Sequence, residues 1–174
     1  VSITYNTDGS RASYKVFDSS WRMKVYNMAV QSDGKFVVAG DIADASPKGG
    51  FLGRYNADGT FDTSFSSDGY LIESGAVFFD VAIQDDGKIL VISNSDGIFR
   101  YNSDGTADSG FNNSYNSNSY GYGKNIALQS DGKIVTLGMY GSNNCCTAIS
   151  RFNSDGTIDN SFSDFHDHKL SSNP

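Results

Sequence analysis

The chain has 174 residues and a mass of 18.7 kDa, enough for one well-buried domain or a few repeat units. Its content of 38% hydrophobic and 13% aromatic residues excludes an intrinsically disordered chain. A net charge of -7 argues against a nucleic-acid partner, because phosphate binding needs clustered Lys and Arg. No run of about 18 apolar residues occurs and the N-terminus is not basic and then apolar, so we expect no membrane insertion and see no signal peptide.

Two short signatures recur in chain order. The first, Gln-x-Asp-Gly-Lys, begins at Gln31, Gln84 and Gln129. The second, Arg-aromatic-Asn-x-Asp-Gly-Thr followed by Asp-x-x-Phe, begins at Arg54, Arg100 and Arg151. A weaker copy, "TYNTDGS", opens the chain and lacks the Asp-x-x-Phe. The signatures divide the chain into a half-unit, three full units and a tail, with boundaries at 1–18, 24–66, 77–111, 123–162 and 163–174.

Each full unit is interpreted as four short strands. The first strand ("YNMAVQ", "FDVAIQ", "KNIALQ") alternates around an alanine and ends at an Asp-Gly turn. The second strand ("KFVVAG", "KILVIS", "KIVTLG") is more continuously apolar, as in a strand buried on both faces. A third strand ("FLGRYN", "GIFRYN", "AISRFN") reaches a second Asp-Gly turn, and we expect the Asp-x-x-Phe segment to form the fourth strand.

A recurring four-stranded unit of about 40 to 55 residues predicts a β-propeller. The expected fold is therefore all-β, a β-propeller-like repeat of four-stranded antiparallel blades, with three full units and an N-terminal half-unit. The two signatures together resemble the bacterial delta-60 repeat family over nearly the whole chain. The resemblance implies a propeller-like segment of a large secreted or surface protein, hence an extracellular or cell-surface location. It carries over no catalytic residues.

The two kinds of Asp-Gly turn are expected at one edge of the blades, because both follow strands that run in the same direction. The other edge receives connections that differ between units, such as "GDIADASPKGG", "NSDG" and "GMYGSNNCC". Variable loops on a regular scaffold are where binding usually resides. We therefore expect any function of this chain at the edge away from the Asp-Gly turns.

The segment 112–123, "NNSYNSNSYGYG", is the main candidate for ligand contact. Tyrosine offers a flat apolar face for a sugar ring, and asparagine offers paired donors and acceptors. The alternative is a polar linker whose tyrosines pack on a blade edge. The candidate ligand-binding residues are Tyr115, Asn116, Asn118, Tyr120 and Tyr122, with Tyr140 and Trp21 as secondary candidates.

Metal binding is a weaker hypothesis, and no cofactor is expected. The Asn and Asp residues of the second signature do not follow the ligand spacing of an EF-hand, and turn formation already accounts for them. Asp164, His166 and His168 alternate in the tail, where they could share one face of a strand or remain solvated. Cys145 and Cys146 are adjacent, which favours two small buried or half-buried residues in a strand, with a vicinal disulfide in a turn as the alternative.

The sequence favours a non-enzymatic recognition or adhesion module whose partner is a cell-surface glycan or protein. Both histidines lie in the tail, and no nucleophile or phosphate-binding motif occurs. One alternative is a structural spacer or oligomer-forming module of a large surface protein. A second alternative is a hydrolase that uses Asp41, Asp44 and Asp80, which the repeat leaves unassigned. Three blades expose two sheet edges, so we expect a homo-oligomer or a longer chain, unless the tail adds a strand to the half-unit.

Overall fold

The computed structural model describes residues 2–5, 11–15, 22–43, 49–93, 97–113, 122–140, 146–162 and 165–166. Every regular element in these ranges is a β-strand. Accordingly, the described ranges hold no helix able to cross a membrane. The all-β expectation is confirmed.

Three antiparallel sheets follow one another along the chain, and we call them the first, second and third blades. The first holds β3 (Met23–Val30), β4 (Phe36–Ile42), β5 (Gly49–Tyr55) and β6 (Tyr70–Ser74). The second holds β7 (Phe78–Ile83), β8 (Ile89–Ser93) and β9 (Ile98–Tyr101). The third holds β10 (Tyr122–Leu128), β11 (Ile134–Tyr140), β12 (Cys146–Phe152) and β13 (Phe165–His166). In each blade the strand order equals the chain order, as the propeller prediction requires.

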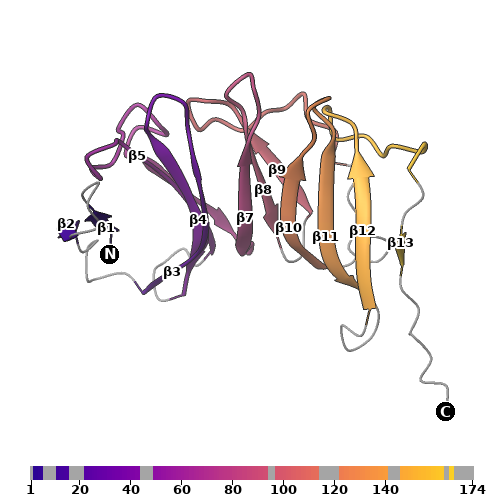
Figure 1. Cartoon of the computed structure of the whole chain (residues 1–174), viewed down its shortest axis with the longest axis horizontal. Helices are drawn as coiled ribbons and strands as arrows, with labels where there is room; N and C mark the ends of the chain where they lie inside the picture. The colour runs from indigo at the N-terminus through magenta and orange to yellow at the C-terminus, as the bar shows by residue number, and fades with distance from the viewer. Residues whose placement is uncertain are drawn as a thin grey trace, which may run out of the picture.

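Figure 1 shows the blades in an open row from the N-terminal to the C-terminal end of the molecule. A separate two-stranded sheet, β1 (Ser2–Tyr5) and β2 (Arg11–Lys15), lies at one end, and β13 lies at the other. The tail strand does not join the N-terminal half-unit, because β13 pairs with β12, with Ala148 opposite His166. That possible closure is therefore wrong.

The Gln-x-Asp-Gly-Lys turns have the expected geometry. Gly34 has a φ of 84°, which the turn requires and which glycine adopts without steric cost. The Asp33 carboxylate accepts a hydrogen bond of 3.0 Å from the Lys35 amide, and the Gln31 amide donates to the Lys35 carbonyl at 2.7 Å. Because β3 and β5 run in the same direction, this turn and the second signature lie at the same edge of the blade.

The Asp-x-x-Phe segment is not the fourth strand. In the first blade it forms a tight turn, with the Phe65 amide donating to the Asp62 carbonyl at 2.9 Å, and only a single bridge joins Tyr55 to Phe61. The fourth strand is β6, which lies beyond residue 66 in a segment expected to connect two blades. The Asp side chain accepts bonds from its own turn, which bends the chain before it can extend.

The hydrophobic core lies between the blades. Val37, Ala39 and Leu52 of the first blade pack against one face of the second, including Ile89 and Val91. On the other face of the second blade, the equivalent residues Leu90, Ile92 and Ile98 pack against Ile126, Ile134 and Phe152 of the third. The second strand is thus buried on both faces in the first two blades, as expected. In the third blade, β11 alternates between buried and exposed positions instead.

Candidate functional site

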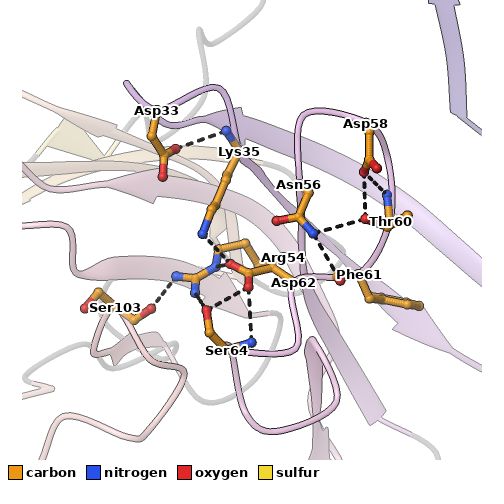
Figure 2. A network of polar contacts seen from close by, with 10 residues as sticks. All are labelled: Asp33, Lys35, Arg54, Asn56, Asp58, Thr60, Phe61, Asp62, Ser64 and Ser103. Atoms are coloured by element: carbon orange, nitrogen blue, oxygen red, sulfur yellow. Dashed lines mark hydrogen bonds and ion pairs between the residues drawn. The ribbon is translucent and has the colours of Figure 1, made fainter.

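The edge that carries the Asp-Gly turns also carries a repeated group of charged side chains. In the first blade, the Asp62 Oδ2 atom accepts hydrogen bonds of 2.8 Å from both Lys35 Nζ and Arg54 Nε (Figure 2). The other oxygen of Asp62 accepts from the amide and hydroxyl of Ser64, at 3.1 and 2.7 Å. Lys35 of the first signature and Arg54 of the second therefore converge on one carboxylate.

The environment of Asp62 favours its ionised form. Burial alone would raise the pKa of this carboxyl, but the hydrogen bonds from Lys35 and Ser64 and the charge of Arg54 hold the pKa well below its usual range. Arg54 and Asp62 each keep only 8% of their side-chain surface exposed. A buried ion pair whose two partners are also hydrogen-bonded to other groups is a structural element whose disruption is costly.

Arg54 extends this group to the next blade. Its Nη1 atom donates to the backbone carbonyl of Ser103, in the Asp-Gly turn of the second blade. Its guanidinium lies 5.0 Å from the centre of the Phe65 ring, and the Ser66 amide donates to the Asp104 carbonyl of the same turn at 2.8 Å. This Arg-Asp-Phe group thus holds the turn of the following blade, and we call the group an interblade clamp.

The clamp is repeated in the second blade. Asp108 accepts from Lys88 at 3.0 Å and from Arg100 at 2.7 Å, while Arg100 Nη1 donates to the Ser154 carbonyl of the third blade at 2.6 Å. The Asn112 amide donates to the Asp155 carbonyl at 2.8 Å. The hydrogen bond from Lys88, the largest cause, holds the pKa of Asp108 below its usual value.

The third blade has the same residues, but the described part of the chain holds no blade that follows it. Asp159 accepts from Lys133 at 2.9 Å and from Arg151 at 2.7 Å. Arg151 donates to Asp159 and Ser161, and no acceptor in another blade is found for it in the described part of the chain. Its side chain is 20% exposed, compared with 8% for Arg54.

The acidic residues of the second signature do not converge as cation ligands would. Asp58 accepts from the amide and hydroxyl of Thr60 at 2.9 and 2.6 Å, and Asn56 donates to the same hydroxyl at 3.0 Å. Asp62 points away from both, into the clamp (Figure 2). Within the described ranges, no group of three or more His, Cys, Asp or Glu residues is arranged to hold a metal ion.

One family profile matches the chain, described as "Domain of unknown function (DUF5122) beta-propeller", at residues 31–65, 84–111 and 129–162. These ranges cover more than half of the 174 residues. The chain belongs to this family. The description of the DUF5122 family does not include the name delta-60, which remains a resemblance. No curated protein matches the chain.

The DUF5122 ranges coincide with the clamps. Each range begins at the Gln of the first signature and ends at the Phe of the clamp, at Phe65, Phe111 and Phe162. Each matched range therefore holds the second and third strands of a blade together with the residues of the clamp. The segment 112–123, which contains most of the candidate ligand residues, lies outside the matched ranges.

Asp80 has a further scaffold role that the sequence did not reveal. This residue is 5% exposed and lies at the bulge of β7, the first or innermost strand of its blade. Asn27 and Asn125 occupy the same position in the innermost strands of the other two blades, β3 and β10. Its carboxylate accepts from Asn27 Nδ2 at 2.5 Å, from the Val81 amide at 2.8 Å and from the Ile126 amide at 2.9 Å. Asp80 therefore links all three blades. Of the other two aspartates considered for hydrolysis, Asp41 lies in β4 and Asp44 lies outside the described residues.

Two of the candidate ligand residues lie at the edge opposite the Asp-Gly turns. Tyr122 begins β10 and is paired with Met139, while Tyr140 ends β11 and is paired with Cys146. The structure thus brings the backbones of these two tyrosines to the same end of the third blade. The remaining candidates lie outside the described residues: Tyr115, Asn116, Asn118, Tyr120 and Trp21.

The tail residues are described only in part. His166 lies in β13, and Asp164 and His168 lie outside the described residues, as does Cys145. Cys146 is the first residue of β12, in agreement with a strand position for at least one of the two cysteines.

The clamps are the main feature that the sequence analysis missed. Lys, Arg, Asp and Phe each recur once per full unit, at fixed places in the two signatures. That joint recurrence was the available signal. The sequence analysis considered the two signatures separately, as turns and strands, and so did not predict the contact between their Lys, Arg and Asp residues.

Proposed function

We propose that the chain is a non-catalytic recognition module of a secreted or surface protein, with its ligand contacts at the edge opposite the Asp-Gly turns. The observation that carries the proposal is a difference between the two edges: the scaffold uses the charged groups of the turn edge, and the loops that differ between units lie at the other edge. At the turn edge, the charged side chains of the signatures are bound to one another or to the next blade. Groups already satisfied by the scaffold are poor ligand contacts, because binding would have to replace their hydrogen bonds.

The chemistry of the opposite edge favours a glycan as the ligand. Tyr122 and Tyr140 lie there, next in sequence to a segment rich in Tyr and Asn. Aromatic faces and amide groups are the pair of features that recognises the apolar face and the hydroxyls of a sugar ring. With its net charge of -7, the chain suits a neutral or cationic ligand better than an acidic one.

A glycan array with the whole chain tests the proposal. Reproducible binding is expected, with at least a tenfold loss for Tyr120→Ala and Tyr122→Ala. Asp131→Asn, which alters a turn at the opposite edge, is the matched control and should leave binding unchanged. An absence of glycan binding, or a loss in Asp131→Asn equal to that in the tyrosine variants, contradicts the proposal.

A second candidate function is that of an assembly module. It is favoured by the large apolar side chains exposed at both ends of the row of blades, in β3 and β11. A stable multimer in light scattering without any ligand binding would support this function over recognition.

A further inference from the structure

The two ends of the blade row expose the two halves of one type of junction. Inside the molecule, each junction joins one face of a blade, which we call its leading face, to the opposite face of the next blade, its trailing face. Equivalent positions can be assigned from the signatures and from the strand register. This makes it possible to compare the internal junctions with the two free ends, position by position.

The leading face of the third blade is exposed where the others are buried. Ala39 of the first blade and Ile92 of the second are both 0% exposed within the junctions. Their equivalent in the third blade, Leu137, is 40% exposed, and Met139 on the same face is 39% exposed. Leu137 is paired with Ile149, as Ala39 is paired with Leu52, so the same face of the sheet is concerned.

The trailing face of the first blade is likewise exposed where the trailing faces of the other two blades are buried. Val81 and Ile126, on the innermost strands of the second and third blades, are 6% and 7% exposed. Their equivalent in the first blade is Met28, which is 51% exposed, and Val30 on the same face is 68% exposed. Large apolar side chains at these levels of exposure, in adjacent positions of a strand face, mark a protein interface.

These two surfaces match the contact that the internal junctions make. There, the innermost strand of each blade lies against the first two strands of the preceding blade: β7 against β3 and β4, and β10 against β7 and β8. By the same arrangement, β3 of one molecule would lie against β10 and β11 of another. Leu137 and Met139 would then face Met28 and Val30.

The clamp of the third blade supports the same arrangement. Arg54 and Arg100 each donate from Nη1 to the carbonyl of the residue that precedes Asp-Gly in the next blade, Ser103 and Ser154. The equivalent residue of the first blade is Ala57, whose carbonyl accepts no hydrogen bond from the described residues. Arg151 is the one clamp arginine without such an acceptor among these residues, so donor and acceptor lie at opposite ends of the row.

From these observations we infer that a second copy of the chain docks head to tail, with the leading face of the third blade against the trailing face of the first. The Arg151 guanidinium of one copy donates to the Ala57 carbonyl of the other. Two copies contribute six blades, within the range of about four to eight that closed propellers use. A head-to-tail contact that closes on itself makes a ring and leaves neither face exposed. The inference does not depend on glycan recognition.

The mass of the chain in solution, measured by light scattering over a range of concentrations, is the test. The expected mass is about twice 18.7 kDa. Leu137→Asp and Met28→Asp should each reduce it to that of a single chain, because each places an unpaired charge in both junctions. Ala107→Asp, an exposed site on the second blade, is the matched control and should leave the mass doubled.

Mixing the two variants distinguishes head-to-tail docking from other associations. A mixed pair has one junction in which both Leu137 and Met28 are native, so mixing should restore the doubled mass. Three results would each overturn the inference: a wild type with the mass of a single chain, a Met28→Asp variant that keeps the doubled mass while Leu137→Asp loses it, or a mixture that does not recover the doubled mass. Circular dichroism checks that the variants are folded, and Leu137→Ser and Met28→Ser replace any variant that is not. A loss of glycan binding with the mass unchanged would concern the proposed function alone.

Discussion

The junction between the first two blades and the leading face of the third blade are made from equivalent residues, yet their environments differ. In the junction, Arg54 reaches the Ser103 carbonyl and Phe65 is fully buried. In the third blade, Arg151 bonds, among the described residues, to partners in its own blade, and Phe162 is half-buried. The intrablade part of the clamp therefore forms without a neighbour, whereas the burial of its aromatic residue depends on one.

This difference separates two contributions to stability. Lys, Arg and Asp meet within a single blade: Arg and Asp are eight residues apart in every blade, and Lys35 and Asp62 are 27 residues apart in the first. The apolar contribution appears only when a second blade supplies the opposing surface, because a sheet face is stabilised by what covers it. The substitutions below test this separation.

Phe65→Ala is expected to have the largest effect. It leaves a cavity in a fully buried junction and should lower the free energy of unfolding by about 3–5 kcal/mol. Phe162→Ala, at the equivalent position with no described blade of the same chain beyond it, should cost about 1 kcal/mol when both substitutions are made in the single-chain Leu137→Asp variant. Urea denaturation of both variants measures the difference. Equal losses would show that the Phe residues act within their own blades.

Gly156→Ala should have an intermediate effect, because this glycine is where one blade touches the next. With a φ of 89°, an alanine there carries about 1–2 kcal/mol of backbone strain. Its Cβ would also overlap the Asn112 carbonyl and lie 2.7 Å from the Phe111 ring, which should add about 1–3 kcal/mol.

Gly132→Ala is the matched control for Gly156→Ala. Gly132 has a similar φ of 80°, but the nearest atom to its Cβ would be that of Ser154 at 3.7 Å. Only the backbone strain should remain, so the midpoint of urea denaturation should fall less than for Gly156→Ala. Equal shifts would mean that the turn alone, and not the junction, requires glycine.

The smallest expected effect is a loss of stability in acid. The pKa values of Asp62, Asp108 and Asp159 are all held below their usual value, so the unfolded chain binds protons at a higher pH than the folded chain does. Their contribution is complete above the unfolded pKa of about 3.9 and is lost as the pH falls below it towards the folded values. The melting temperature should be nearly constant from about pH 5 to 7 and fall below about pH 4.

Asp62→Asn sharpens the acid experiment. It should melt at a lower temperature than the wild type at pH 7 and lose less on acidification, because one of the three carboxylates no longer titrates. If the variant lost as much melting temperature on acidification as the wild type, Asp62 would not contribute to the acid sensitivity.

Much of the blade could be predicted from sequence because its determinants are local. The Asp-Gly turns follow from residues two apart, such as Asp33 and Lys35, and the strands follow from short apolar runs. The fourth strand was misplaced because Asp62 bonds to Ser64 and ends the extended conformation, a local preference that the repeat pattern does not show. The order of the strands and the shared edge of the turns followed once the unit was recognised.

The contacts between blades could not be predicted from the sequence, for a physical reason. Arg54 and Ser103 are 49 residues apart, and Asp80 reaches Asn27 and Ile126 across 53 and 46 residues. Such contacts depend on how one sheet is positioned against the next, which no local pattern specifies. By itself, the sequence determined a series of antiparallel blades with their Asp-Gly turns at one edge, since these depend on near neighbours. Only the tertiary structure decided that the same turn residues hold the blades together, and that Leu137 and Met28 remain exposed, because burial is a property of a pair of surfaces.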